Sequence, residues 1–429
     1  MRNFKKIVAT ALAGVLVITG TACNSGDSGQ SNNGEHNLTF QIWDINQQAG
    51  MQAIGDAYTE ENPNVNIEVQ VTSWDEYWTK LEAAATGGDL PDIFWMHTNE
   101  ILKYADNGFL AETTDVVDTA KFSEISLANA SGSDGTLYGV PKDKDTIGLI
   151  YNKEMFDQAE VAYPDETWTW DDLVEASQKI YDETGKYGYM PYADDQLGYW
   201  NFVYQADGYI LNDDKTEAGF TNPKTREAME FYIGLQENDW SPKQTFFAET
   251  PPGTAFFSEL GAMFFEGNWN VLAQLENYPE MQGKWDVAVL PMYPNPEGDN
   301  DGRATISNGL AYSTSADNPN LDVVMDVLEF FASEEGQRIQ GESGAAIPAY
   351  EGLEESWLGA FDDYDINVEV FIDMFDYGIQ SVNDASRSIW KPQVNDELLR
   401  IYSGGVSLEE GLDNMQTIVD EAIEEYGAQ

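Results

Sequence analysis

Histidine and cysteine are scarce in this chain of 429 residues, which has two histidines, His36 and His97, and one cysteine, Cys23. Because His36 lies in a polar stretch near the N-terminus, only His97 can belong to a folded site. This excludes a metal site built from several histidines and argues against catalysis by a histidine base. Residues 297–302 are similar to the first half of a calcium loop, but Asn308 stands where that loop needs glutamate. We therefore expect no metal and no cofactor.

Positive charge is also scarce. Lysine and arginine total 21 against 76 aspartates and glutamates, and the formal net charge is −55. A surface of this sign repels nucleic acid and anionic lipid head groups, so neither is expected as a partner. Hydrophobic residues make up 42% and aromatic residues 13% of the chain, which is enough to build a core despite the charge. The length suits two ordinary domains.

The N-terminus has the pattern of an export signal. Arg2, Lys5 and Lys6 precede an apolar run over residues 7–18, followed by small residues at 20–22. The apolar run is too short to span a bilayer as a permanent helix. We therefore interpret residues 1–22 as a signal peptide, and no second membrane segment follows in the sequence.

Cys23 directly follows the small residues and resembles the cysteine of a bacterial lipobox, although Gly20 stands where that motif usually has leucine. The resemblance implies that Cys23 becomes the lipid-modified first residue of the mature protein. On the alternative interpretation, Cys23 is an unpaired thiol in an exported chain. Residues 24–37 are rich in serine, asparagine and glycine, a composition typical of a flexible tether. We thus expect residues 23–37 to anchor and tether a globular body.

Residues 38–96 contain the clearest structural pattern of the chain. An apolar run at 38–43 predicts a strand, and strict alternation over 65–72 predicts a second one. Helical spacing over 74–85 follows, and the run 91–96 reads as a third, buried strand. Strand, helix, strand, helix, strand indicates a parallel sheet with right-handed crossovers.

Ligands of such sheets bind at the carboxyl ends of the strands. Trp43 ends the first predicted strand and Asn46 follows it, while His97 and Asn99 follow the third. We expect these side chains to meet at one rim of the sheet and to form half of a binding site.

Other segments carry weaker local signals. Strands are expected over 146–152 and 262–266, and a helix is expected after Thr169, which is a plausible N-cap. A Trp-Lys-Pro sequence at 390–392 is expected to break the C-terminal helices, because proline lacks the backbone N–H.

The order and spacing of the first segment resemble a known family. Trp43 follows a short strand, and the sequences Glu-Glu-Asn-Pro at 60–63, Tyr-Trp-Thr-Lys-Leu at 77–81 and Gly-Asp-Leu-Pro-Asp-Ile-Phe at 88–94 come after it. This set is similar to the opening of the maltose-binding-protein-like extracellular solute-binding proteins that serve carbohydrate ABC importers.

The resemblance implies an α/β fold of two lobes, the type II fold of periplasmic binding proteins, with the ligand cleft between lobes joined by crossing hinge strands. The first lobe would comprise residues 38–144 and 309–348. The second would comprise residues 145–308 and 349–429.

The same resemblance implies further ligand contacts. The residues that would face the cleft are an acidic residue near the start of the first crossing and an amide at the second. An aromatic loop, a tryptophan that follows a strand and an aromatic residue near the C-terminus would face it as well. These residues are Asp145, Asn308, Tyr199 with Trp200, Trp269 and Trp390. Two alternatives stay open, in which Asp145 is a solvated member of a charged run and Trp269 packs the lobe.

These residue types suit a neutral oligosaccharide. Aromatic rings cover the C–H faces of a sugar, and carboxylates, amides and imidazoles bind its hydroxyls. We expect two lobes to close over the ligand and the closed form to be recognised by the permease subunits of an ABC importer. The protein would be a monomer at the extracellular face of the bacterial membrane, attached only through its lipid.

Three other functions remain as alternatives. The first is a binding protein of the same fold for a peptide or a polyamine. The second is a carbohydrate-active enzyme with an acid and base pair, although carboxylates are too abundant here for any pair to be informative. The third is a surface adhesin for glycans, which would not close on its ligand.

Overall fold

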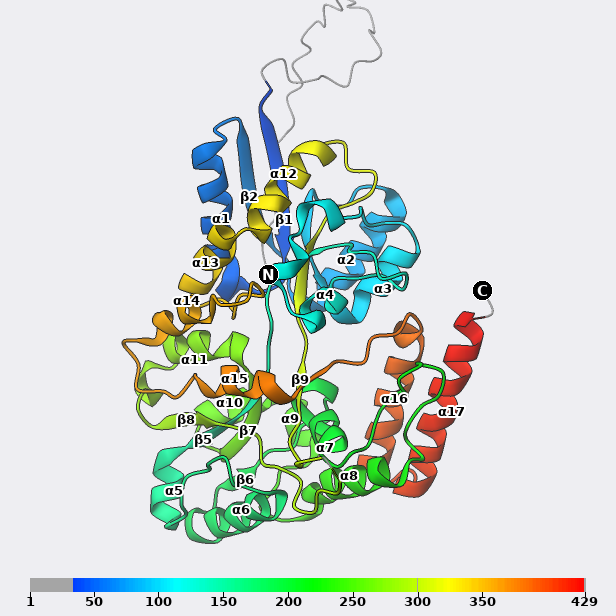
Figure 1. Cartoon of the computed structure of the whole chain (residues 1–429). Helices are drawn as coiled ribbons and strands as arrows, with labels where there is room; N and C mark the ends of the chain where they lie inside the picture. The colour runs from blue at the N-terminus through cyan, green and yellow to red at the C-terminus, as the bar shows by residue number, and fades with distance from the viewer. Residues whose placement is uncertain (1–33, 299, 428–429) are drawn as a thin grey trace, which may run out of the picture. The chain divides into compact units, whose positions relative to one another are not determined.

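A computed structural model of the chain describes residues 34–298 and 300–427. It divides into a unit of residues 1–35 and a unit of residues 36–429, and the following concerns the second unit. Two sheets with separate hydrophobic cores form two α/β lobes (Figure 1). Among the residues described, no helix combines the length and the apolar character needed to cross a membrane.

The first lobe is built on a five-stranded sheet of order β2-β1-β3-β10-β4. Strands β1, β2 and β3 are parallel, and β10 runs antiparallel to β3 and β4. The strands are β1 (His36–Ile42), β2 (Val65–Val71), β3 (Ile93–His97), β4 (Val140–Pro141) and β10 (Leu310–Ser313). The helices are α1 (Gln48–Glu61), α2 (Trp74–Gly87), α3 (Thr98–Asp106), α4 (Glu124–Asn129), α12 (Leu321–Ala332) and α13 (Glu334–Glu342).

The local signals of this lobe act as predicted. Strand β2 alternates between buried and exposed residues, because its valine and isoleucine side chains point to one face of the sheet. Helix α2 ends at Gly88, whose φ of 71° is a left-handed conformation that glycine adopts without strain. Every residue of β3 is buried, as expected for a central parallel strand. The predicted strands and crossover helices are confirmed.

The second lobe is built on a four-stranded sheet of order β6-β7-β5-β8, and a small parallel pair joins β9 to β11. The strands are β5 (Ile147–Asn152), β6 (Tyr187–Tyr189), β7 (Gly261–Gly267), β8 (Trp285–Ala288), β9 (Thr305–Ser307) and β11 (Gly378–Gln380). The helices before β9 are α5 (Lys153–Ala159), α6 (Trp170–Thr184), α7 (Trp200–Gln205), α8 (Pro223–Gly234), α9 (Gln244–Phe247), α10 (Pro252–Phe257) and α11 (Val271–Asn277). Those after it are α14 (Glu354–Leu358), α15 (Val370–Asp373), α16 (Arg387–Tyr402) and α17 (Leu408–Gly427).

Helix boundaries in this lobe match one prediction and contradict another. Thr169 caps α6 in a reciprocal capping box with Asp172, so the predicted N-cap is confirmed. The predicted break at 390–392 is wrong, because α16 continues through Pro392. Proline removes one intrahelical hydrogen bond, and the buried side chains of Trp390 and Val394 hold the helix on both sides of it.

The chain passes between the sheets three times, at residues 142–146, 308–309 and 343–353. These crossing segments are hydrogen-bonded to one another. The backbone N–H of Asn308 donates to the Asp145 carboxylate at 2.6 Å, and that of Lys144 donates to the carbonyl of Ile347 at 3.1 Å. A Cβ on Gly309 would lie 2.7 Å from the carbonyl oxygen of Asp143, so only glycine permits this approach.

Candidate functional site

A cavity of about 440 Å³ lies where the two lobes and the crossing segments meet. Its size is within the range of small-ligand sites. The first lobe and the crossing segments contribute Trp43, Asp44, Gln47, Trp74, His97, Asn99, Asp143, Lys144, Asp145, Leu310 and Ala346. The second lobe contributes Asp194, Asp195, Gln196, Leu197, Asn268, Trp269 and Asn270.

The first lobe presents an aromatic wall to this cavity. Trp43 follows β1, and its ring packs edge-on against Trp74 at 5.1 Å and Trp95 at 5.0 Å between centroids. Trp74 begins α2 and is 46% exposed, whereas Trp95 is fully buried behind Trp43. The edge-on packing holds the Trp43 ring in one orientation. The exposed part of Trp74 therefore offers an apolar face to a ligand.

His97 and Asn99 lie at the start of α3, directly after β3. The Nδ1 atom of His97 accepts the backbone N–H of Asn99 at 3.1 Å, so the Nε2 atom carries the proton of the neutral ring. Burial lowers the pKa of His97 to about 4, with a further contribution from Arg387. His97 is therefore a neutral hydrogen-bond donor at physiological pH. The Oδ1 atom of Asn99 is buried without a partner in the described part of the chain.

Asp145 joins two of the crossing segments. Its Oδ1 atom accepts the backbone N–H of Asn308 at 2.6 Å, and its carboxylate lies 3.4 Å from the amide nitrogen of Gln196 in the second lobe. Burial raises the pKa of Asp145 to about 8, and the N–H of Asn308 opposes this shift. The side chain therefore reaches the cavity as a group that both donates and accepts hydrogen bonds at neutral pH.

Lys142 neutralises the carboxylate next to Asp145. Its fully buried ammonium group lies 2.6 Å from Asp143 and 3.0 Å from the side-chain oxygen of Gln47. It also lies 4.5 Å from the centre of the Trp95 ring. A buried cation of this kind is tolerated because these three neighbours are two acceptors and a ring face. It fixes Asp143 and Gln47 at the cavity.

Trp269 faces the cavity from the second lobe. It follows β7 in a short 3-10 turn (Asn268–Asn270), and its ring lies over the backbone of Gly267. A Cβ on Gly267 would come within 2.0 Å of that ring. The neighbouring Asn268 accepts the backbone N–H of Thr146 at 3.2 Å, while its Nδ2 atom is buried without a partner among the described residues. The cavity wall here combines an aromatic face with an unused donor.

A buried ion cluster supports the second-lobe wall. Asp195 lies 2.7 Å from Arg387 and 2.5 Å from Lys391 of α16. Burial alone would raise the pKa of Asp195, but the two cations lower that pKa by more than burial raises it, so the net shift is downward. The pKa of the adjacent Asp194 rises to about 6 because it is buried and lies beside Asp195. The wall thus contains one carboxylate that two cations hold in the ionised form and one whose pKa is raised.

The family model of the bacterial extracellular solute-binding proteins matches residues 43–338. The chain belongs to this family. The solute-binding protein is similar to a lactose-binding protein of Rhizobium radiobacter, with 25% identity over 299 residues that cover 68% of this chain and 67% of the relative. It is also similar to a galactooligosaccharide-binding protein of Bacillus subtilis (strain 168), with 22% identity over 372 residues that cover 82% of each. The sequence resemblance to this family is confirmed.

Solved structures show the same fold. An ABC substrate-binding protein of Listeria monocytogenes in complex with cycloalternan matches with a TM-score of 0.80 at 22% identity, over 91% of this chain and 99% of that one. The GacH receptor of Streptomyces glaucescens, solved without ligand and with acarbose, matches with a TM-score of 0.80 at 20% identity and the same coverage. The solute-binding protein therefore has the two-lobed type II fold of periplasmic binding proteins, and the predicted fold class is confirmed.

Half of the candidate ligand residues line the central cavity. Trp43, His97, Asn99, Asp145 and Trp269 do so. Asn46 instead lines two neighbouring pockets. Asn308 is 1% exposed, and both polar atoms of its side chain lack a partner within the described ranges.

The structure differs from the expectation for Tyr199, Trp200 and Trp390, whose side chains are at most 1% exposed and belong to the core of the second lobe. The reason is that Trp200 and Trp390 pack on Arg387, with the guanidinium carbon 5.0 Å and 5.4 Å from their ring centroids. They support the ion pair with Asp195 and offer no face to a ligand.

Sequence reasoning missed Trp74, Asn268 and Asp194. The position of Trp74 could have been predicted from its spacing. It lies three residues before Tyr77 and four before Trp78, and therefore on the same face of α2, one turn closer to the rim of the sheet. Asn268 precedes Trp269 and could have been included with it. Asp194 gave no local signal, because its place at the cavity depends on tertiary packing. Within residues 34–298 and 300–427, no group of three or more histidine, cysteine, aspartate or glutamate side chains is placed so that it could hold a metal ion.

Proposed function

We propose that this protein is an extracellular, lipid-anchored binding protein that captures a neutral oligosaccharide by hinge closure and delivers it to the permease of an ABC importer. The observation that supports this most is the combination, in one cavity between two lobes, of exposed indole faces with polar atoms that have no partner. Trp74 and Trp269 provide the faces, and the unpaired atoms are Oδ1 of Asn99 and Nδ2 of Asn268.

Sugar hydroxyls would supply the missing hydrogen-bond partners. A buried polar atom left unpaired costs about 1–3 kcal/mol, so a ligand that pairs with both atoms recovers that free energy. An aromatic contact contributes about 0.5–1.5 kcal/mol beyond the area that it buries. Two such contacts and a few hydrogen bonds reach the scale of about 8 kcal/mol that a micromolar complex needs. The relatives named for lactose and galactooligosaccharides favour this class of cargo.

Closure would bring the two halves of the site together. The first lobe, which we assign to residues 38–144 and 309–348, carries Trp43, Trp74 and His97. The second, residues 145–308 and 349–429, carries Asn268 and Trp269. The two separate hydrophobic cores support this division except near its boundary at residue 348, where Ile347 packs in the second core and Ala349 in the first. A ligand that contacts both lobes binds the closed form better and shifts the equilibrium toward it. The permease would recognise that closed form.

The anchor and the location follow from the N-terminal sequence. Cys23 and the predicted tether would hold a monomer at the outer face of the bacterial membrane. The expected end of that tether at residue 37 is corrected, because His36 and Asn37 already belong to β1 and pair with β2. Cys23 lies outside the described residues, and the proposal for it depends on the lipobox resemblance. Palmitate labelling in a bacterial host, with Cys23→Ser as the negative control, would detect the lipid.

Isothermal titration calorimetry tests the cargo. The purified protein is titrated with neutral oligosaccharides, with short peptides and with spermidine as separate panels. We expect saturable binding of at least one neutral oligosaccharide with a dissociation constant of about micromolar or below. Binding of a peptide or of spermidine with no response to any saccharide would overturn the proposal.

A further inference from the structure

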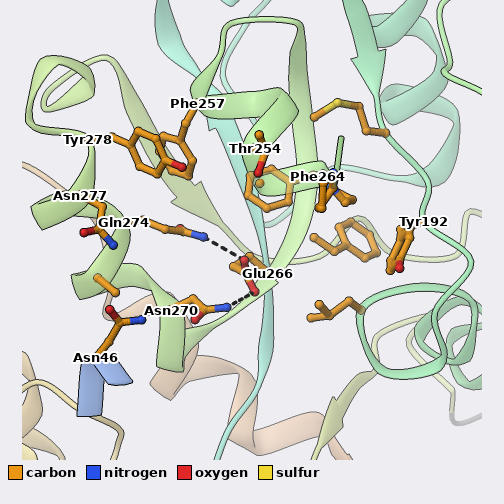
Figure 2. Close-up of a pocket in the computed structure, with 17 residues that line it drawn as sticks. Asn46, Tyr192, Thr254, Phe257, Phe264, Glu266, Asn270, Gln274, Asn277 and Tyr278 are labelled. Carbon is orange, nitrogen blue, oxygen red and sulfur yellow. Dashed lines mark hydrogen bonds between the residues drawn. The ribbon is translucent and has the colours of Figure 1, made fainter. Parts of the chain in front are cut away.

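A second cavity, the side pocket, adjoins the central cavity. Its volume is about 380 Å³, and it shares Leu197 and Asn270 with the central cavity. Strand β7 and helices α10 and α11 of the second lobe form its walls, and Asn46 of the first lobe lies at its edge (Figure 2). A ligand that passes Leu197 and Asn270 would therefore enter the side pocket while it still contacts the central cavity.

Five of the residues that line the side pocket are aromatic. Phe257 and Tyr278 stack in parallel, with centroids 4.4 Å apart and planes inclined by 6°. Phe264 of β7 lies between this pair and Tyr192 in Figure 2, and Tyr192 is 38% exposed. An exposed tyrosine at the opening of an apolar pocket offers both a ring face and a hydroxyl, which is the combination that a sugar ring requires.

A buried carboxylate organises the polar side of the pocket. Glu266 is 6% exposed, and it accepts a hydrogen bond from the backbone N–H of Gly267 at 3.0 Å. It also accepts hydrogen bonds from Asn270 at 3.2 Å and from Gln274 at 2.9 Å (Figure 2). Burial raises its pKa, and these three donors oppose the shift. Its acceptor sites are thus largely used within the protein.

The three hydrogen bonds also fix the orientation of two amide groups. Because the amide nitrogens of Asn270 and Gln274 face Glu266, their carbonyl oxygens face away from it. The Oε1 atom of Gln274 is buried and has no partner in the described part of the chain. It is an acceptor that a hydroxyl donor can satisfy.

We propose that the side pocket is a subsite that holds one further unit, or a branch, of the oligosaccharide bound in the central cavity. This inference depends on the proposed function. It adds that the bound oligosaccharide has at least one more sugar unit than the central cavity holds. The unit is a neutral sugar ring, because the pocket offers aromatic faces and amide oxygens, and its carboxylate is already paired with N–H donors. Asn46 contacts this unit from the opposite lobe.

Gly253 provides a way to fill the pocket. It belongs to α10, and a Cβ added there would lie 3.8 Å from the Phe264 ring and 3.9 Å from the side-chain nitrogen of Gln274. These are ordinary van der Waals distances, so Gly253→Leu extends a side chain into the pocket without a clash at Cβ. Gly234 of α8 has no atom within 4 Å of such a Cβ, and Gly234→Leu is the matched control.

The test measures dissociation constants by calorimetry for neutral oligosaccharides from disaccharide to pentasaccharide, in the series that binds the wild type. We expect the wild-type affinity to rise about tenfold when the chain becomes long enough to reach the side pocket. Gly253→Leu should abolish this gain and leave the disaccharide affinity within about twofold, and Gly234→Leu should retain it. Tyr192→Ala, which removes an exposed wall residue, should also abolish the gain. It provides the test if Gly253→Leu does not fold.

The outcomes separate this inference from the proposed function. If the wild type binds oligosaccharides but affinity does not rise with length, or if Gly253→Leu and Tyr192→Ala both retain the rise, the subsite assignment is wrong and the proposed function stands. If no saccharide of any length binds the wild type, the proposed function fails and the subsite fails with it.

Discussion

Replacing Trp269 by alanine is expected to weaken oligosaccharide binding by about tenfold or more and to leave the melting temperature of the unliganded protein nearly unchanged. The side chain lines the cavity and is only partly buried, so its loss exposes little core. The free energy lost is the aromatic contact plus the burial of the indole face by the ligand. Together these contribute at least about 1.4 kcal/mol to binding, which corresponds to a tenfold change in affinity. Calorimetry gives the first quantity and thermal denaturation the second.

Trp285→Ala is the matched control for this prediction. Trp285 is 1% exposed in the core of the same lobe, and removing a buried tryptophan costs about 3–5 kcal/mol of stability. We expect a large fall in melting temperature for Trp285→Ala and almost none for Trp269→Ala. A comparable fall in both would show that Trp269 packs the lobe.

A second substitution tests the position of the Trp269 ring. Gly267 has an extended backbone that alanine also adopts, but an added Cβ would displace the indole that lies over it. Gly267→Ala should therefore weaken binding in the wild type and have no further effect in the Trp269→Ala background. Equal effects in both backgrounds would mean that Gly267 acts through another contact.

Replacing Asp195 by alanine is expected to lower the free energy of unfolding by about 3–5 kcal/mol, because it removes the ion-pair partner of the buried Arg387 and of the largely buried Lys391. The side chains of Arg387 and Lys391 are 6% and 20% exposed. The net downward pKa shift of Asp195 means that this contribution is fully present at neutral pH. It is lost as the pH falls below about 4, the pKa of an unfolded aspartate.

Urea denaturation followed by circular dichroism measures this change. Glu76→Ala serves as the control, because Glu76 forms an ion pair of 2.8 Å with Lys80 in which both side chains are more than 60% exposed. Exposed pairs contribute little, so the control should denature at the wild-type urea concentration. If Asp195→Ala and the control unfold at the same urea concentration, other groups compensate the charges of Arg387 and Lys391.

Much of the fold was predictable because its signals are local. Alternation over 65–72, the turn glycines after α2 and the capping threonine at 169 each determine an element within a few residues of sequence. The convergence of Trp43 with His97 and Asn99 also followed, since the carboxyl ends of neighbouring parallel strands lie at one edge of the sheet.

The candidate site was predictable where a residue lies just beyond a strand, and also at Asp145, which the family resemblance assigned to the first crossing. Trp269 follows β7 and is not needed by the sheet, and the structure places it at the cavity. Trp200 and Trp390 lie inside helices, and which side of each helix is buried depends on contacts with distant segments. Arg387, which packs on both, pairs with a carboxylate 192 residues earlier in the chain. No local pattern contains that information.

The central claim is that two lobes close on a neutral oligosaccharide. Small-angle X-ray scattering from the protein alone, and then with a saturating concentration of the saccharide identified by calorimetry, tests it most directly. The account predicts a smaller radius of gyration with the saccharide, and no change with a saccharide that does not bind in the calorimeter. Superimposable scattering profiles with and without the bound saccharide would contradict it.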